Sequence, residues 1–199
     1  TLCDAANPRG GAWGANDTIV LAPTAAAGLS QVSAAGGEPQ AMTKLKEGEV
    51  SHRWPQFLPD GKTILYAIAA GGDPEDAQIA VHQLDTGEQK ILIRGGTYPW
   101  YVPTGHLVYY RAGIILGVPF NLARLEVTGP LAPVVQGVMA TVGTGAAQFS
   151  FSSRGSLVYV PGGSQTGGLT LVWVDRKGTE KSFPAAPRGV AATAASTCA

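Results

Sequence analysis

The feature that most constrains the fold is a unit of roughly 45 residues that recurs along the chain. Each occurrence contains a short apolar segment, and the anchor residues Ile19, Ile64, Leu107 and Leu157 lie 45, 43 and 50 residues apart. Self-similarity at this period is typical of proteins built from stacked supersecondary units, in which each unit buries its apolar face against the next. The repeat therefore favours a modular fold over one continuous core.

A tight turn precedes the apolar segment in every unit. In the last three units the turn contains Gly61, Gly105 or Gly155, and Asn16-Asp17 takes its place in the first. Glycine readily adopts the positive φ that a tight connection between two strands requires. An aromatic segment stands before each turn: Ala12-Trp13-Gly14, Trp54-Pro55-Gln56-Phe57, Pro99-Trp100-Tyr101 and Gln148-Phe149-Ser150-Phe151. Each unit is therefore predicted to begin with strand, turn and strand.

The second half of each unit has a weaker strand-turn-strand pattern, clearest at 78–93 and again at 169–183. No segment shows convincing helical periodicity. Four strands per unit predict an all-β fold of four four-stranded antiparallel blades, as in a β-propeller. We place the blades at 5–46, 47–95, 96–139 and 140–183, with 1–4 as a strand left from a preceding blade and 184–199 as an irregular tail.

Composition argues against several kinds of partner. The 14 Lys and Arg residues balance the 14 Asp and Glu residues, so the chain lacks the basic surface of a nucleic-acid or anionic-membrane binder. No apolar run reaches the ~18–20 residues of a membrane span. Cys3 and Cys198 have no zinc-ligand spacing, and two free thiols or a bridge between them both remain open. We therefore expect no nucleic acid, membrane, metal or cofactor for this chain.

No catalytic signature is present in the sequence. The chain contains neither the His-Arg-Asp and Asp-Phe-Gly motifs of a kinase nor the Gly-x-Ser-x-Gly elbow of an esterase. Gly61-Lys62-Thr63 is interpreted as a turn, and the acidic segment 73–76 as a solvated loop, because three carboxylates supply only part of a calcium site. A catalytic triad that combines His52, His82 or His106 with a distant serine is the less favoured alternative.

The segment Trp54-Pro55-Gln56-Phe57-Leu58-Pro59-Asp60-Gly61 resembles the repeat core of TolB-like, WD-repeat-like β-propellers. The order of 1–4, 10–14 and 52–61 is similar to the propeller that follows the kinase domain in bacterial membrane serine/threonine protein kinases. The resemblance covers about residues 1–183. The resemblance implies a bacterial propeller that lies outside the cytoplasm, although a cytoplasmic location stays open. It also makes the chain look like a four-blade piece of a larger ring. We expect two copies to join as an eight-bladed homodimer.

Two function classes follow from this resemblance. The favoured one is a non-catalytic binding or sensor module that presents an axial channel and loops to a protein or small ligand. The alternative is an esterase- or lactonase-like hydrolase at the channel mouth, as in six-bladed relatives that place carboxylates around a metal. The innermost strands offer few carboxylates here, which favours binding.

The predicted site lies on the innermost strands, because the first strand of each propeller blade lines the axis. The candidate residues are His52, Arg53, Trp54, Gln56, Trp100, Tyr101 and Gln148. Arg53 beside Trp54 offers a guanidinium fork for a carboxylate or phosphate next to a stacking surface. That Arg53 merely packs against a neighbouring blade is the alternative.

Overall fold

The computed structural model describes residues 2–71, 76–141, 143–152 and 154–162, together with the backbone of 164–165, 172–174 and 180–182. The chain divides into two compact units, Thr1–Ser164 and Gln165–Ala199. In the second unit, β19 (Val172–Val174) pairs antiparallel with β20 (Glu180–Ser182). The site described below lies entirely in the first unit.

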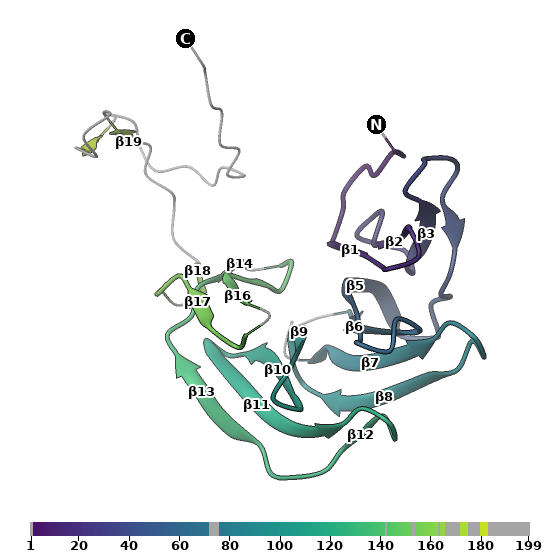
Figure 1. Cartoon of the computed structure of the whole chain (residues 1–199). Helices are drawn as coiled ribbons and strands as arrows, with labels where there is room; N and C mark the ends of the chain where they lie inside the picture. The colour runs from purple at the N-terminus through teal and green to yellow at the C-terminus, as the bar shows by residue number, and fades with distance from the viewer. Residues whose placement is uncertain are drawn as a thin grey trace. The chain divides into compact units, whose positions relative to one another are not determined.

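The first two sheets are four-stranded antiparallel meanders, because each strand pairs with the next one along the chain (Figure 1). The first comprises β1 (Gly11–Trp13), β2 (Thr18–Leu21), β3 (Ser30–Ser33) and β4 (Gln40–Ala41). The second comprises β5 (Glu49–Phe57), β6 (Thr63–Ala70), β7 (Gln78–Gln83) and β8 (Gln89–Arg94).

The third sheet repeats this order with a divided outer edge. It contains β9 (Thr97–Val102), β10 (His106–Arg111) and β11 (Ile114–Asn121). Both β12 (Glu126–Val127) and β13 (Ala132–Gln136) pair with β11, at its two ends. The remaining strands of this region are shorter: β14 (Ala140–Thr141), β15 (Ala146–Ala147), β16 (Phe149–Phe151), β17 (Leu157–Tyr159) and β18 (Ser164–Gln165).

The turns that the glycines predicted have one geometry. The amides of Gly61, Gly105 and Gly155 each donate to the carbonyl oxygen three residues earlier, at 2.9, 3.0 and 3.0 Å. All three glycines have a positive φ, between 66° and 84°, and Asp17 takes the left-handed conformation in the first sheet. The residue types at these positions therefore determine the connection between the first two strands of each sheet.

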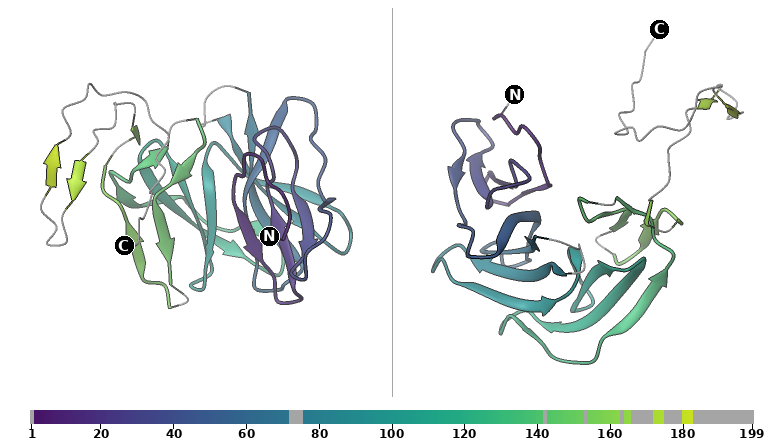
Figure 2. Two further views of the ribbon diagram at one scale, coloured as in Figure 1. Left: turned by 90° about the horizontal axis from the view of Figure 1, so that it is seen from above. Right: turned by 180° about the vertical axis from the view of Figure 1, so that it is seen from behind.

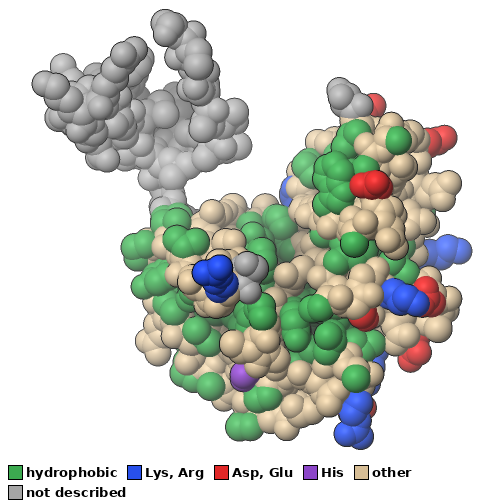
Figure 3. Space-filling view, in the orientation of Figure 1, with side chains coloured by type: hydrophobic (Ala, Val, Ile, Leu, Met, Phe, Trp, Pro, Cys, Tyr) green, Lys and Arg blue, Asp and Glu red, His purple; other side chains and the backbone are tan. Residues whose placement is uncertain are grey.

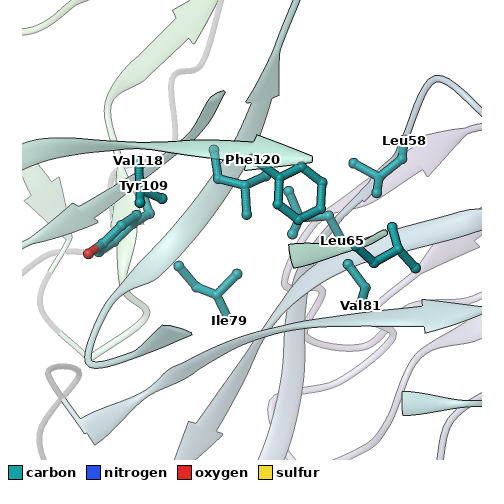
Figure 4. Close-up of a cluster of buried hydrophobic side chains, with 9 residues drawn as sticks. Leu58, Leu65, Ile79, Val81, Tyr109, Val118 and Phe120 are labelled. Atoms are coloured by element: carbon teal, nitrogen blue, oxygen red, sulfur yellow. The ribbon is translucent and has the colours of Figure 1, made fainter. Parts of the chain in front are cut away.

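The core consists of three apolar clusters, each lying between neighbouring sheets rather than inside one of them. Figure 4 shows the cluster between the second and third sheets, where Leu65 and Ile79 of one sheet face Tyr109, Val118 and Phe120 of the other. Figure 2 shows from two further directions that the sheets of the first unit stand side by side. Such packing makes each sheet depend on its neighbours for burial.

Two of the innermost strands contain the same bulge. In β5, Trp54 and Pro55 together lie opposite Tyr66 alone, because Arg53 pairs with Ala67 and Gln56 with Leu65. In β9, residues 98 and 99 lie in the same way opposite residue 109. A bulge of this kind bends the strand and changes the direction of the following side chains.

The predicted all-β class with four-stranded antiparallel sheets is confirmed. No helix in the described residues is long and apolar enough to cross a membrane. Cys3 is a free, partly buried thiol, while Cys198, most of the acidic segment 73–76 and the predicted tail lie outside the described residues. The blade boundaries and the pairing of two copies stay predictions.

Candidate functional site: an axial cavity

A cavity of about 330 Å³ lies where the first three sheets approach one another along their innermost strands. Each sheet contributes three consecutive residues: Gly10, Gly11 and Ala12; Trp54, Pro55 and Gln56; Tyr98, Pro99 and Trp100. Trp54 and Tyr98 are separated by the same 44 positions as the turn residues Gly61 and Gly105. The cavity is therefore built from structurally equivalent positions in successive repeats.

The backbone conformation at these positions explains why the three strands converge. Gly10, Trp54 and Tyr98 all have a positive φ, of 96°, 55° and 53°. The left-handed conformation is uncommon for residues other than glycine. Here Trp54 and Tyr98 adopt it at the two bulges, where it changes the direction of the strand. At Gly10 no side chain fits, because a Cβ atom would lie 2.9 Å from Cε3 and 3.1 Å from Cα of Trp54.

The cavity wall is mainly aromatic, with a few polar groups. The rings of Trp54 and Tyr98 lie 5.2 Å apart, and Tyr98 makes an edge-on contact with Phe149 at 5.3 Å. Burial raises the pKa of Tyr98, which keeps its hydroxyl protonated at neutral pH. Gln56 Oε1 accepts a hydrogen bond of 2.7 Å from the amide of Tyr101. This bond fixes the side-chain amide of Gln56 at the wall.

A loop that follows β14 is held against the second and third sheets beside this cavity. Arg53 Nη1 donates to the carbonyl oxygens of Gly143 and Thr144, at 3.2 and 3.1 Å, and Trp54 Nε1 donates to that of Thr144 at 3.3 Å. Thr97 Oγ1 donates to Gly145 O at 3.3 Å. Residues about 90 positions apart thus meet at the innermost strands. Figure 1 shows the β14–β15 hairpin extending toward β5 and β9.

The structure brings some of the sequence-predicted site residues together and separates others. Trp54, Gln56 and Trp100 line the cavity, and Arg53 directly precedes its second lining segment. The Tyr101 ring instead contacts Phe120, at 6.2 Å, within the core. Exposed Gln148 belongs to the fourth group of strands, where its backbone bonds Met139 and Val160.

His52 is fully buried and does not line the cavity. Its Nδ1 lies 2.7 Å from Thr43 Oγ1, and its Nε2 lies 3.0 Å from Glu49 Oε2. Thr43 Oγ1 also accepts a 2.7 Å hydrogen bond from the amide of Leu29. Burial lowers the pKa of His52, although Glu49 opposes this effect. The polar network therefore joins the first sheet to the second.

The sequence pattern did not identify Gly10, Gly11, Ala12, Tyr98 and Pro99 as lining residues. An offset of 44 residues, the mean of the first two anchor spacings of 45 and 43, would have found Tyr98 and Pro99, since it aligns them with Trp54 and Pro55. In the space-filling view, hydrophobic side chains are spread over much of the face, and most of the visible charged side chains lie on its right-hand half (Figure 3).

Comparison with solved structures places this arrangement among known folds. The chain is similar to a calcium-binding protein, regucalcin, from Agrobacterium tumefaciens, with a TM-score of 0.57 at 12% identity over 87% of this chain. It is also similar to TolB from Acinetobacter baumannii, with a TM-score of 0.55 at 18% identity over 88% of this chain. A structure of the nidogen/laminin complex matches 78% of this chain, at 16% identity and a TM-score of 0.54. All of these are propellers.

The chain has a β-propeller fold, with a resemblance to TolB. It spans 58%, 42% and 57% of the three matched chains. No protein-family model matches the sequence, and no curated protein matches it significantly. In this propeller the cavity occupies the region next to the axis, where the innermost strands of the blades meet.

Proposed function

We propose that this propeller is a non-catalytic binding module whose axial cavity receives a small planar ligand or a planar side chain of a protein partner. The observation that carries the proposal is the composition of the wall, in which Trp54, Tyr98 and Trp100 provide the large surfaces. Aromatic rings bind planar groups by stacking or edge contacts. The polar groups of Tyr98 and Gln56 orient such a group.

The size of the cavity supports a small occupant. Its volume of about 330 Å³ lies at the lower end of the ~300–1,000 Å³ typical of small-molecule sites. One fused ring system with a single polar substituent fits such a space. Because the strands that form the wall are held by inter-sheet packing, the site is largely formed before the ligand binds.

The lining residues also support binding rather than hydrolysis. The nine residues include no Asp, Glu, His, Cys, Ser or Lys, so the wall offers no activated nucleophile with an adjacent base. Among the described residues, no group of three or more His, Cys, Asp and Glu side chains is placed to hold a metal ion. A hydrolase would need its chemistry to come from another part of the protein.

Location and self-association belong to the same proposal. The resemblance to TolB-like propellers supports an extracytoplasmic site of action. A second copy of the chain is proposed as a further partner, since a ring closed by two copies would cover the apolar faces of the outermost blades.

The experiment is a calorimetric titration with indole, a neutral planar probe. We expect saturable binding that is weakened about tenfold or more by Trp100→Ala. Trp13→Ala is the matched control, because Trp13 lies on β1 outside the cavity and is 63% exposed. Equal effects of the two variants, or no binding of indole, would contradict the axial site.

A parallel assay tests the non-catalytic assignment. Purified protein is incubated with 4-nitrophenyl acetate, with and without a chelator, and no turnover above the buffer rate is expected. Reproducible turnover that is lost in Tyr98→Phe would show catalysis in the cavity and overturn the assignment.

A further inference from the structure

Two arginines occupy the same position in successive blades of the propeller. Arg9 directly precedes the first lining segment of the cavity, and Arg53 directly precedes the second. The main chains of the two residues are linked, because the amide of Trp54 donates a 2.7 Å hydrogen bond to the carbonyl oxygen of Arg9. Both side chains therefore start from the same end of the lining strands.

The hydrogen bonds of Arg53 fix its guanidinium but leave part of it available. Nε donates to Ser51 Oγ at 2.6 Å, and Nη1 donates to the two loop carbonyls. Nη2 has no partner among the described residues. The guanidinium is rigid and planar, so these bonds also fix the direction of the N–H groups of Nη2.

Arg9 is also held from one side only. Its Nη1 contacts Asn7 Oδ1 at 2.5 Å and Pro8 O at 3.0 Å. Its Nε is buried and has no hydrogen-bond partner in the described part of the chain. A buried donor without a partner costs free energy, so the hydrogen-bonding capacity of the Arg9 guanidinium is not fully used within the described part of the chain.

Neither arginine forms an ion pair with a carboxylate of the described residues. Within the described ranges, the carboxylates that form ion pairs do so with His52, Lys62, Lys90 and Arg124. Burial lowers the pKa of Arg53, and repulsion from the positive charge of Arg9 lowers it further. Two like charges that are partly buried and unpaired favour an anion between them.

We propose that the guanidinium groups of Arg9 and Arg53 form an anion subsite at one end of the axial cavity, which selects a planar ligand bearing a carboxylate. This inference rests on the proposed binding function and names the ligand class. A carboxylate matches the planar fork of an arginine and accepts its hydrogen bonds in the same plane. The ring attached to that carboxylate then lies against Trp54 and its neighbours.

The test compares two probes of nearly equal shape, indole-3-carboxylate and indole-3-carboxamide, by calorimetry. We expect the carboxylate to bind about tenfold more tightly or better, and this preference to shrink at high salt. The preference should disappear in Arg9→Gln and fall in Arg53→Lys, which keeps the charge but loses the fork. Arg94→Gln is the matched control, because Arg94 is an exposed residue at the end of β8.

The outcomes separate this inference from the proposed function. If both probes bind equally and Arg9→Gln changes neither affinity, the anion subsite is wrong although the cavity binds. If neither probe binds, the cavity function itself fails. Inorganic phosphate is the third probe, and phosphate binding as tight as that of indole-3-carboxylate would show an anion site without selection for a ring. Far-UV circular dichroism of each variant verifies that it retains the β-sheet fold.

Discussion

The substitution Thr43→Val tests whether the buried polar network around His52 stabilises the packing of the first sheet against the second. Valine has nearly the shape of threonine, so the change removes the hydroxyl with little loss of volume. Two buried partners then lose a hydrogen bond: the amide of Leu29 and Nδ1 of His52, each at 2.7 Å. Both residues are fully buried, and water does not replace the missing partner.

The magnitude follows from the number of groups left unpaired. Each buried, unsatisfied group costs about 1–3 kcal/mol, so the loss of two partners in Thr43→Val should lower the free energy of unfolding by about 2–6 kcal/mol. The assay is urea denaturation followed by tryptophan fluorescence. The midpoint should fall while the slope of the free energy against urea stays the same, because the surface exposed on unfolding does not change.

Thr86→Val is the matched control for this experiment. The Thr86 hydroxyl also accepts a hydrogen bond from a backbone amide, that of Glu88 at 3.2 Å, but on an exposed turn where water replaces it. We expect a change below about 0.5 kcal/mol for this variant. If Thr43→Val were no more destabilising than Thr86→Val, the network would not contribute to the stability of the interface.

Three further predictions concern pH, the cavity and a turn. Burial lowers the pKa of His52 from 6.5, so the unfolded chain binds more protons than the folded chain below that pH. The contribution of His52 to the free energy of unfolding should therefore be fully present above about pH 6.5 and decrease as the pH falls. His52→Gln should reduce this dependence of the free energy of unfolding on pH. Glu49 adds to the loss at lower pH, since burial raises its pKa but the hydrogen bonds from the Lys46 amide and from His52 outweigh that effect and hold it below 4.5. Gly10→Ala should lower the midpoint of urea denaturation and weaken indole binding, because the new Cβ meets Trp54, whereas Gly48→Ala carries only the strain of its φ of 83°, with no atom within 4 Å. Asp60→Ala removes the acceptor of the Lys62 and Thr63 amides, at 3.0 Å each, and should lower the free energy of unfolding by about 1–2 kcal/mol. The control Asp85→Ala loses only an exposed ion pair with Lys62, so it should change the midpoint of urea denaturation little.

The turns and the class of fold were available from the sequence because they depend on local properties. Gly61, Gly105 and Gly155 stand where a positive φ is needed, and no neighbouring sheet is required to explain them. The short apolar runs in 63–68 and 106–110, each preceded by a glycine turn, likewise predict strands. Repetition then implies packing between like units, which the three apolar clusters between neighbouring sheets confirm.

The cavity was only partly available from the sequence, because strand alternation does not show a bulge in advance. At Trp54-Pro55 two residues face one, so the regular alternation of side chains along β5 is broken. His52 therefore points into the interface with Thr43, while Trp54 and Gln56 reach the axis. A count of alternate positions along this strand places all of them on the axis.

Contacts between distant repeats were decided by the tertiary structure alone. Nothing in the order of residues shows that Arg53 bonds the loop at 143–144, or that the carbonyl oxygen of Arg9 accepts a hydrogen bond from the amide of Trp54. The sequence by itself determined the repeat, the turns and the apolar strands, since each depends on neighbours along the chain. The residues that line the cavity, and the partners of the charged side chains beside it, depend on which strands meet at the axis. Only the packing of the sheets against one another determines which strands meet there.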